Sequence, residues 1–172
     1  MSTSYHRRLR LLVAALALAS PWALAGDLPT FPGLLSIPIP KQYGYGGYFA
    51  QHQPVKIVFG VSDPGGQLKE TLANAAYVIR DLKSRGAAYS IQVVLYGNAV
   101  RAADAFGQRY AGYAPLLEAL AKQGVQFRVC YNSLASLHQD PASVYDYMKV
   151  VPAGILQIAK KEMQGYAYVS NR

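Results

Sequence analysis

Two hydrophobic patterns alternate along the chain from residue 55 onward. Short runs rich in β-branched residues, such as VKIVFGV at 55–61, are typical of strands buried on both faces. Between these runs, apolar residues recur at helical spacing. In the first helical region they are Leu68, Leu72, Ala75, Ala76, Ile79 and Leu82. Strands that alternate with helices in this way predict βαβ units and a mainly parallel sheet.

The same two patterns continue to the end of the sequence. Further strands are predicted at 89–97, 125–132, 149–152 and 165–169. One helix is predicted at 114–123, with Pro115 in its first turn and Gly124 just past its end, and another at 153–164. Short helical turns are predicted from Ser133 and from Asp140. The sequence therefore predicts an α/β fold, a three-layer α/β/α sandwich with a mainly parallel five-stranded sheet, over residues 55–172.

Residues 26–54 follow neither pattern. This segment, GDLPTFPGLLSIPIPKQYGYGGYFAQHQP, is rich in proline, glycine and tyrosine. Its five prolines argue against regular helix, so we expect an extended N-terminal arm that runs over the surface of the domain.

The first 25 residues resemble a secretory signal peptide. Arg7, Arg8 and Arg10 precede an apolar run without charge, which ends in the small-x-small sequence Ala-Leu-Ala at 23–25. The alternative is an uncleaved membrane anchor, but the run is interrupted by a proline and is short for the roughly 20 residues of a spanning helix. We expect residues 1–25 to be removed and the protein to be periplasmic, with no membrane association afterwards.

Cleavage would leave 147 residues, which is the size of one ordinary domain. The loss of three arginines would lower the formal net charge from +8 to +5. Lys160 and Lys161 form the only adjacent basic pair in the remaining sequence. Because nucleic-acid binding requires a concentrated basic surface, we expect no nucleic-acid partner.

Cys130 is the only cysteine, so no internal disulfide can form. An unpaired cysteine in an exported protein indicates either pairing between molecules or a free thiol. Parallel sheets bind ligands beyond the carboxyl ends of their strands, and Cys130 ends the third predicted strand. The following helix start and Arg128 on the same strand face would lower its pKa. The alternative is a cysteine that only fills space in the core. A reactive role requires a sulfur that solvent can reach.

Other polar residues follow the predicted strands at the same edge. Asp63, Asn98, Asn132 and Ser133 are candidates for ligand binding beside Cys130. Each has a structural alternative, because Asp63 is suited to cap a helix and the asparagines favour turns. With one cysteine and two histidines after residue 25, the sequence has no metal-ligand spacing, and we expect neither a metal nor a cofactor.

Four passages of the sequence together resemble a known family. They are LANAAYVIRDLKSRG, IQVVLYGNAV, LLEALAKQGVQFRVCYNSL and VVPAGILQIAKKEMQGYAYV. In their order and spacing, over residues 55–170, they are similar to DsrE/DsrF-like proteins with the YchN-like fold. The resemblance implies a small parallel α/β sandwich and a trimer or hexamer. It also implies a role in sulfur metabolism, where some members pass sulfane sulfur along cysteine persulfides, and Cys130 matches a cysteine of exported relatives.

Two hypotheses follow for the function. In the first, the protein is a sulfurtransferase-like periplasmic sulfur carrier: Cys130 holds sulfane sulfur as a persulfide for a donor or acceptor protein, and Asp63, Asn98, Asn132 and Ser133 line the site. In the second, the protein is a non-enzymatic oligomeric binding or assembly module, and Cys130 is a buried structural residue. The sequence does not decide between them.

Overall fold

The computed structural model describes residues 28–35 and 37–171. The predicted signal peptide at 1–25 and the first two residues of the predicted arm lie outside this part of the chain.

The centre of the molecule is a five-stranded sheet in which every pairing is parallel. Its strands are β1 (Val55–Val61), β2 (Tyr89–Leu95), β3 (Gln126–Cys130), β4 (Lys149–Val151) and β5 (Ala167–Val169). They are arranged in the order β4-β3-β2-β1-β5. The central strands are rich in valine, isoleucine and leucine, as expected where both faces of a sheet are covered. The predicted fold is confirmed.

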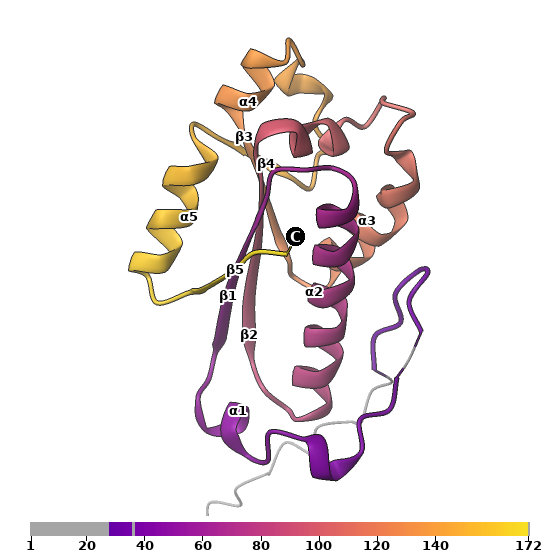
Figure 1. Ribbon diagram of the computed structural model, residues 1–172, viewed down its shortest axis with the longest axis vertical. Helices are drawn as coiled ribbons and strands as arrows, with labels where there is room; N and C mark the ends of the chain where they lie inside the picture. The colour runs from indigo at the N-terminus through magenta and orange to yellow at the C-terminus, as the bar shows by residue number, and fades with distance from the viewer. Residues whose placement is uncertain (1–27, 36, 172) are drawn as a thin grey trace, which may run out of the picture.

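Helices lie on both sides of this sheet (Figure 1). On one side are α2 (Gly66–Ser84) and α3 (Ala114–Lys122), and on the other is α5 (Gly154–Met163). The short α4 (Tyr131–Ser136) directly follows β3 and begins two residues earlier than predicted. The segment after β2 forms a 3-10 helix, η2 (Gly97–Ala103), and further 3-10 turns are η3 (Ala111–Tyr113) and η4 (Pro141–Ser143). This arrangement is the three-layer α/β/α sandwich.

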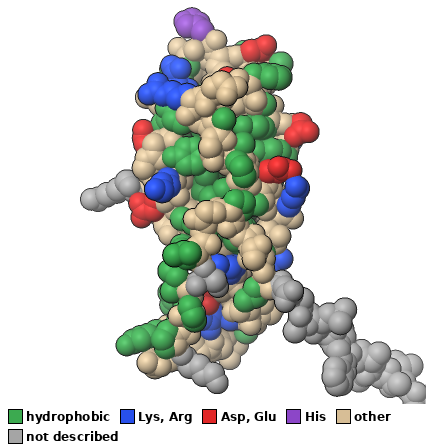
Figure 2. All heavy atoms as spheres, turned by 90° about the vertical axis from the view of Figure 1, so that its right-hand side faces the viewer, with side chains coloured by type: hydrophobic (Ala, Val, Ile, Leu, Met, Phe, Trp, Pro, Cys, Tyr) green, Lys and Arg blue, Asp and Glu red, His purple; other side chains and the backbone are tan. Residues whose placement is uncertain are grey.

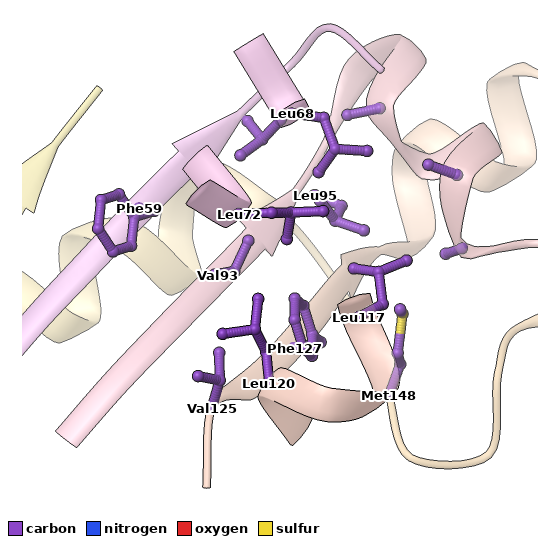
Figure 3. Close-up of a cluster of buried hydrophobic side chains, with 14 of the residues drawn as sticks. Phe59, Leu68, Leu72, Val93, Leu95, Leu117, Leu120, Val125, Phe127 and Met148 are labelled. Carbon is purple, nitrogen blue, oxygen red and sulfur yellow. The ribbon is translucent and has the colours of Figure 1, made fainter. Parts of the chain in front are cut away.

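The main hydrophobic core lies between the sheet and the α2–α3 layer. Figure 3 shows Leu68 and Leu72 of α2 directed toward Val93 and Leu95 of β2, with Phe127 of β3 beside the α3 leucines. Leu68, Leu72 and Phe127 are fully buried. Because the burial of each such side chain contributes about 1.5–3 kcal/mol, this layer contributes strongly to the stability of the fold.

The opposite face, covered by α5, has a much smaller apolar cluster. It consists of Val58, Val94 and Ile158. Next to it, the buried Gln92 accepts a hydrogen bond of 2.6 Å from Gln157 of α5 and donates one of 3.0 Å to Gln126 of β3. The face under α5 therefore has polar side chains at its centre.

The arm lies against the C-terminal half of α2, and Figure 2 shows this side of the molecule. Phe31 is buried in the main core, and Arg80 of α2 donates a hydrogen bond of 2.9 Å to the carbonyl of Leu35. The arm also contains two single helical turns, η1 (Lys41–Tyr43) and α1 (Tyr48–Gln51). The expectation of no regular helix is wrong for these turns, because the interval between Pro40 and Pro54 has no proline to prevent them.

After β5 the chain crosses to α2. There Asn171 is buried and bonded to three side chains that lie on one face of the helix. Gln67 donates to its carbonyl, Asn74 donates to its side-chain oxygen, and its own amide donates to Thr71, each at 2.8 Å. These bonds attach the end of the chain to the first half of α2.

Candidate functional site

The candidate site is the end of β3, where Cys130 is followed directly by α4. β4 ends at Val151 and α5 begins three residues later at Gly154, close to Cys130. A Cβ atom added to Gly154 would lie 3.2 Å from the Cβ of Cys130. The first turns of α4 and α5 therefore meet at this cysteine, with their positive dipole ends toward it.

Hydrogen-bond donors surround the sulfur of Cys130. They are the hydroxyl of Ser133 and the backbone N–H groups of Gly154, Ser133 and Asn132. Cys130 is the N-cap residue of α4, but its neutral thiol makes no regular capping bond. A thiol is a weak acceptor, whereas a thiolate accepts hydrogen bonds strongly, so these donors act mainly on the charged form.

Two opposing effects set the acidity of Cys130. Burial is the largest single effect and raises the pKa of the thiol, because it disfavours the charged form. The Ser133 hydroxyl, and then the N–H groups of Gly154, Ser133 and Asn132, lower the pKa. Together they outweigh burial, and the pKa of the Cys130 thiol lies below its ordinary value.

Cys130 is less accessible to solvent than a reactive role was expected to require. The residue lies at the carboxyl edge of the sheet, as predicted, but it is only 5% exposed. The physical reason is that α4 and α5 begin so close to the end of β3 that their first turns cover the side chain. The next two residues, Tyr131 and Asn132, are exposed, so the sulfur lies just beneath the surface.

Ser133 is held in place by the loop after β2. Its hydroxyl oxygen accepts a hydrogen bond of 2.9 Å from the N–H of Gly97. Since that oxygen already accepts a bond, its own proton remains available for the sulfur of Cys130. Ser133, one of the predicted site residues, thus lies beside Cys130.

The other predicted site residues are arranged less closely. Asn132 contributes its backbone N–H to Cys130, while its side chain is exposed. Asn98 is exposed in η2, next to the Gly97 that binds Ser133. Asp63 is also exposed, and its carboxylate accepts a bond of 2.9 Å from the N–H of Gly65. Asp63 closes a turn before α2 and is not its N-cap, because that position belongs to Gly65.

Arg128 does not act as the sequence suggested. It shares the strand face of Cys130, but its guanidinium donates to the carbonyl of Phe127 and to the side chain of Gln126. The groups that lower the pKa of Cys130 do not include Arg128.

Two glycines contribute to the site without having been predicted. Gly154 supplies an N–H to the sulfur. Gly97 supplies the N–H that holds Ser133. The available signal was topological: both glycines follow parallel strands, β4 and β2, that flank β3 at the same edge.

Within residues 28–35 and 37–171, no helix is long and apolar enough to span a membrane. In the same part of the chain, no group of three or more histidine, cysteine, aspartate or glutamate side chains is placed to hold a metal ion.

Comparison with known proteins identifies the family. The model of the DsrE/DsrF-like family matches residues 55–170, which comprise the whole sheet and all the helices after the arm. The chain belongs to the DsrE/DsrF-like family. This family is associated with sulfur metabolism, and its proteins are often oligomeric. The resemblance in sequence is thus confirmed.

Solved structures support the fold of this DsrE/DsrF-like chain. MTH1491 of Methanobacterium thermoautotrophicum, a protein of unknown function, superposes with a TM-score of 0.59 at 24% identity, over 67% of this chain and 98% of its own. The YchN protein of E. coli gives a TM-score of 0.52 at 20% identity, over 67% and 97% respectively. At these identities the similarity concerns the fold alone. No curated protein is significantly similar in sequence.

Proposed function

We propose that this DsrE/DsrF-like protein is a sulfur carrier that binds sulfane sulfur as a persulfide on Cys130. The observation that supports this function is the ring of donors around the sulfur, from Ser133, Asn132 and Gly154. A cysteine that only fills space in a core gains nothing from such donors. A cysteine that must exist as a thiolate requires them.

The donors suit both steps of a carrier. The thiolate, and not the thiol, attacks a sulfane sulfur, so a lowered pKa increases the reactive fraction near neutral pH. The persulfide that forms also carries its negative charge on sulfur. The first turns of α4 and α5 offer N–H groups to that charge, as helix N-termini do for other anions.

The low exposure of Cys130 limits the reaction. At 5% exposure, the sulfur reacts only with a small donor, or after a shift of the exposed residues Tyr131 and Asn132. We therefore expect transfer to be faster from small sulfane donors than from bulky ones.

Intact-protein mass spectrometry tests the carrier function. Treatment of the native protein with thiosulfate or polysulfide is expected to add the mass of one sulfur atom, and dithiothreitol should remove it. The Cys130→Ser variant should gain nothing. Two outcomes would contradict the carrier function: sulfur is added to the Cys130→Ser variant, or both donors modify the denatured protein but not the native one. Cys130 would then be a structural residue of an assembly module.

We further propose that the protein forms a homo-oligomer, a trimer or a hexamer. The supporting observation is a row of large apolar side chains on α5 that face solvent: Ile155 is 59% exposed, Leu156 71% and Met163 89%. Exposed apolar surface of this kind is typical of protein interfaces.

A periplasmic location is part of the proposal and rests on the signal-like pattern at 1–25 alone. N-terminal sequencing of the protein recovered from the periplasmic fraction should begin at Gly26. Recovery of the intact N-terminus in the membrane fraction would instead favour an anchor.

A further inference from the structure

The side-chain amide of Gln67, in the first turn of α2, connects two segments that are far apart in the sequence. Its oxygen accepts hydrogen bonds from the backbone N–H groups of Ser62 and Asp63, at 2.7 and 3.0 Å. Its nitrogen donates a bond of 2.8 Å to the carbonyl of Asn171. Because the oxygen meets only donors and the nitrogen meets an acceptor, the amide has one favourable orientation. Gln67 therefore holds the loop between β1 and α2 against the end of the chain.

This loop is in direct contact with the turn that follows β2. The carbonyl of Ser62 accepts a hydrogen bond of 3.0 Å from the N–H of Ala99. Gly97 has a φ of +54°, and a Cβ atom added there would lie 3.3 Å from the same carbonyl oxygen. The backbone of Gly97 thus packs closely on Ser62. Since close-packed groups transmit small shifts to their neighbours, the position of Gly97 depends on that of Ser62.

Gly97 in turn orients the hydroxyl of Ser133, to which its N–H donates at 2.9 Å. Ser133 is the third residue of α4 and Cys130 is the N-cap residue. In a capping box, the side chain at this third position reaches back to the cap residue. A hydrogen bond weakens steeply as its angle bends, so a small movement of Gly97 changes how well the hydroxyl proton of Ser133 is directed at the sulfur.

We propose that Gln67 is a positioning residue for the thiolate of Cys130. It holds Ser62 against Gly97, so that Gly97 keeps the Ser133 hydroxyl directed at the sulfur. Because Asn171 holds the other side of the Gln67 amide, the end of the chain is part of this support. The inference rests on the proposed carrier function, since only a reactive thiolate requires aligned donors.

An NMR titration of Cys130 tests this role. The chain has a single cysteine, so protein made with isotope-labelled cysteine gives one Cβ signal. That signal reports the pKa of the thiol whether or not a reagent can reach the sulfur. Gln67→Met keeps the length of the side chain and removes the amide. In this variant the pKa should rise toward its value in Ser133→Ala, because the hydroxyl is no longer held in line with the sulfur.

A double variant decides whether Gln67 acts through Ser133. In the Ser133→Ala background, Gln67→Met should cause no further rise of the pKa, because the hydroxyl that Gln67 positions is already absent. Equal rises in the two backgrounds would show that Gln67 acts independently of Ser133, and the inference would be overturned. An unchanged pKa in Gln67→Met alone overturns it as well.

Asn74→Ala is the matched control for a general loss of stability. Asn74 lies on the same helix, is half-buried like Gln67, and donates to the side chain of Asn171. The variant should lower the free energy of unfolding and leave the pKa of Cys130 unchanged. A rise equal to that of Gln67→Met would contradict a positioning role. If Gln67→Met fails to fold, Gln67→Asn replaces it, because its amide is one methylene too short to reach both segments, and the same rise is expected.

Failure of the carrier function is seen separately. If thiosulfate and polysulfide do not modify the wild-type protein, the carrier function fails, even where the titration shows that Gln67 positions Ser133. If the wild type is modified and Gln67→Met leaves the pKa of Cys130 unchanged, the carrier function stands and the role of Gln67 is refuted.

Discussion

At the residue scale, Cys130 and Ser133 each depend on a backbone group from a different loop. Ser133 is oriented by Gly97, which follows β2, and Cys130 receives an N–H from Gly154, which follows β4. The sulfur is thus stabilised by neutral dipoles from three strand ends. Unlike the field of a charged side chain on the surface, short-range hydrogen bonds of this kind are little affected by salt.

Loss of the Ser133 hydroxyl tests this arrangement. In Ser133→Ala the pKa of the Cys130 thiol should rise, because the variant loses the hydroxyl that lowers it most, and a hydrogen bond to a charged group contributes roughly 1.5–3 kcal/mol. The pH dependence of the iodoacetamide reaction rate measures this shift. Ser136→Ala is the matched control, since the Ser136 hydroxyl donates to a backbone carbonyl of the same helix. An equal pKa in wild type and Ser133→Ala would refute the role of the hydroxyl.

The lowered pKa also makes stability depend on pH. Between the folded-state pKa of Cys130 and the ordinary thiol value, the unfolded chain binds more protons, so the free energy of unfolding should rise with pH. The gain is complete above the ordinary thiol pKa and is lost as pH falls through the folded-state pKa. Urea denaturation of the wild type and Cys130→Ser at several pH values measures the difference. A difference that stays constant, or that falls as pH rises, would contradict the lowered pKa.

The candidate site was only partly predictable from sequence. Cys130, Asn132 and Ser133 are close in sequence, and a strand followed by a helix brings them together by local geometry alone. Gly154 could not be placed beside them, because its position depends on which face of the sheet α5 covers. The shielding of the sulfur follows from the same contact.

At the element scale, the start of α5 leaves no space for a side chain. A Cβ atom on Gly154 would lie 2.8 Å from the Cβ of Tyr96, which is fixed to the β2–η2 backbone. The first turn of α5 can therefore approach β2 and β3 only with glycine at this position.

Gly154→Ala is accordingly expected to lower the free energy of unfolding by about 1–3 kcal/mol, as overpacking does in other cores, and to raise the pKa of Cys130 by displacing an N–H donor. Urea denaturation and the alkylation pH profile measure the two effects. Gly66→Ala is the control, because it is also the first residue of a helix and a Cβ there meets nothing within 4 Å. Equal stability of the two variants would show that α5 tolerates the methyl group.

The elements themselves were largely predictable. The β-branched run at 55–61 coincides with β1, and the helical spacing around Leu72 falls within α2. The first segment is a short apolar run, the second is strongly periodic, and both are bounded by turn-forming residues. The early start of α4 at Tyr131 and the single turns of the arm carry no strong local signal. The pairing of β5 with β1 depends on contacts between residues more than 100 positions apart.

At the scale of the whole molecule, the two sides of the sheet differ in character. The side with α2 and α3 has the large core, and Figure 2 shows its outer surface with Lys and Arg side chains interspersed among Asp and Glu. The side with α5 has a small core, a polar centre and large apolar side chains facing outward. An interface between copies is therefore expected at α5.

Leu156→Glu tests this interface. Leu156 is 71% exposed, so the change costs the monomer little stability, but it places a charge in any apolar contact that α5 makes. The wild type should sediment as a trimer or hexamer in analytical ultracentrifugation, and the variant as a smaller species. Glu162→Gln on the same helix is the control. A monomeric wild type, or an unaltered assembly of the Leu156 variant, would exclude this surface.

The position of Gly154 relative to Cys130 has a consequence for biogenesis. Cys130 is synthesised before Gly154, so its side chain stays uncovered until β4 joins the sheet and α5 packs beside it. Until then, the nascent chain carries an ordinary, accessible thiol. The lowered pKa and the shielding of Cys130 therefore arise together, when α5 completes this part of the fold.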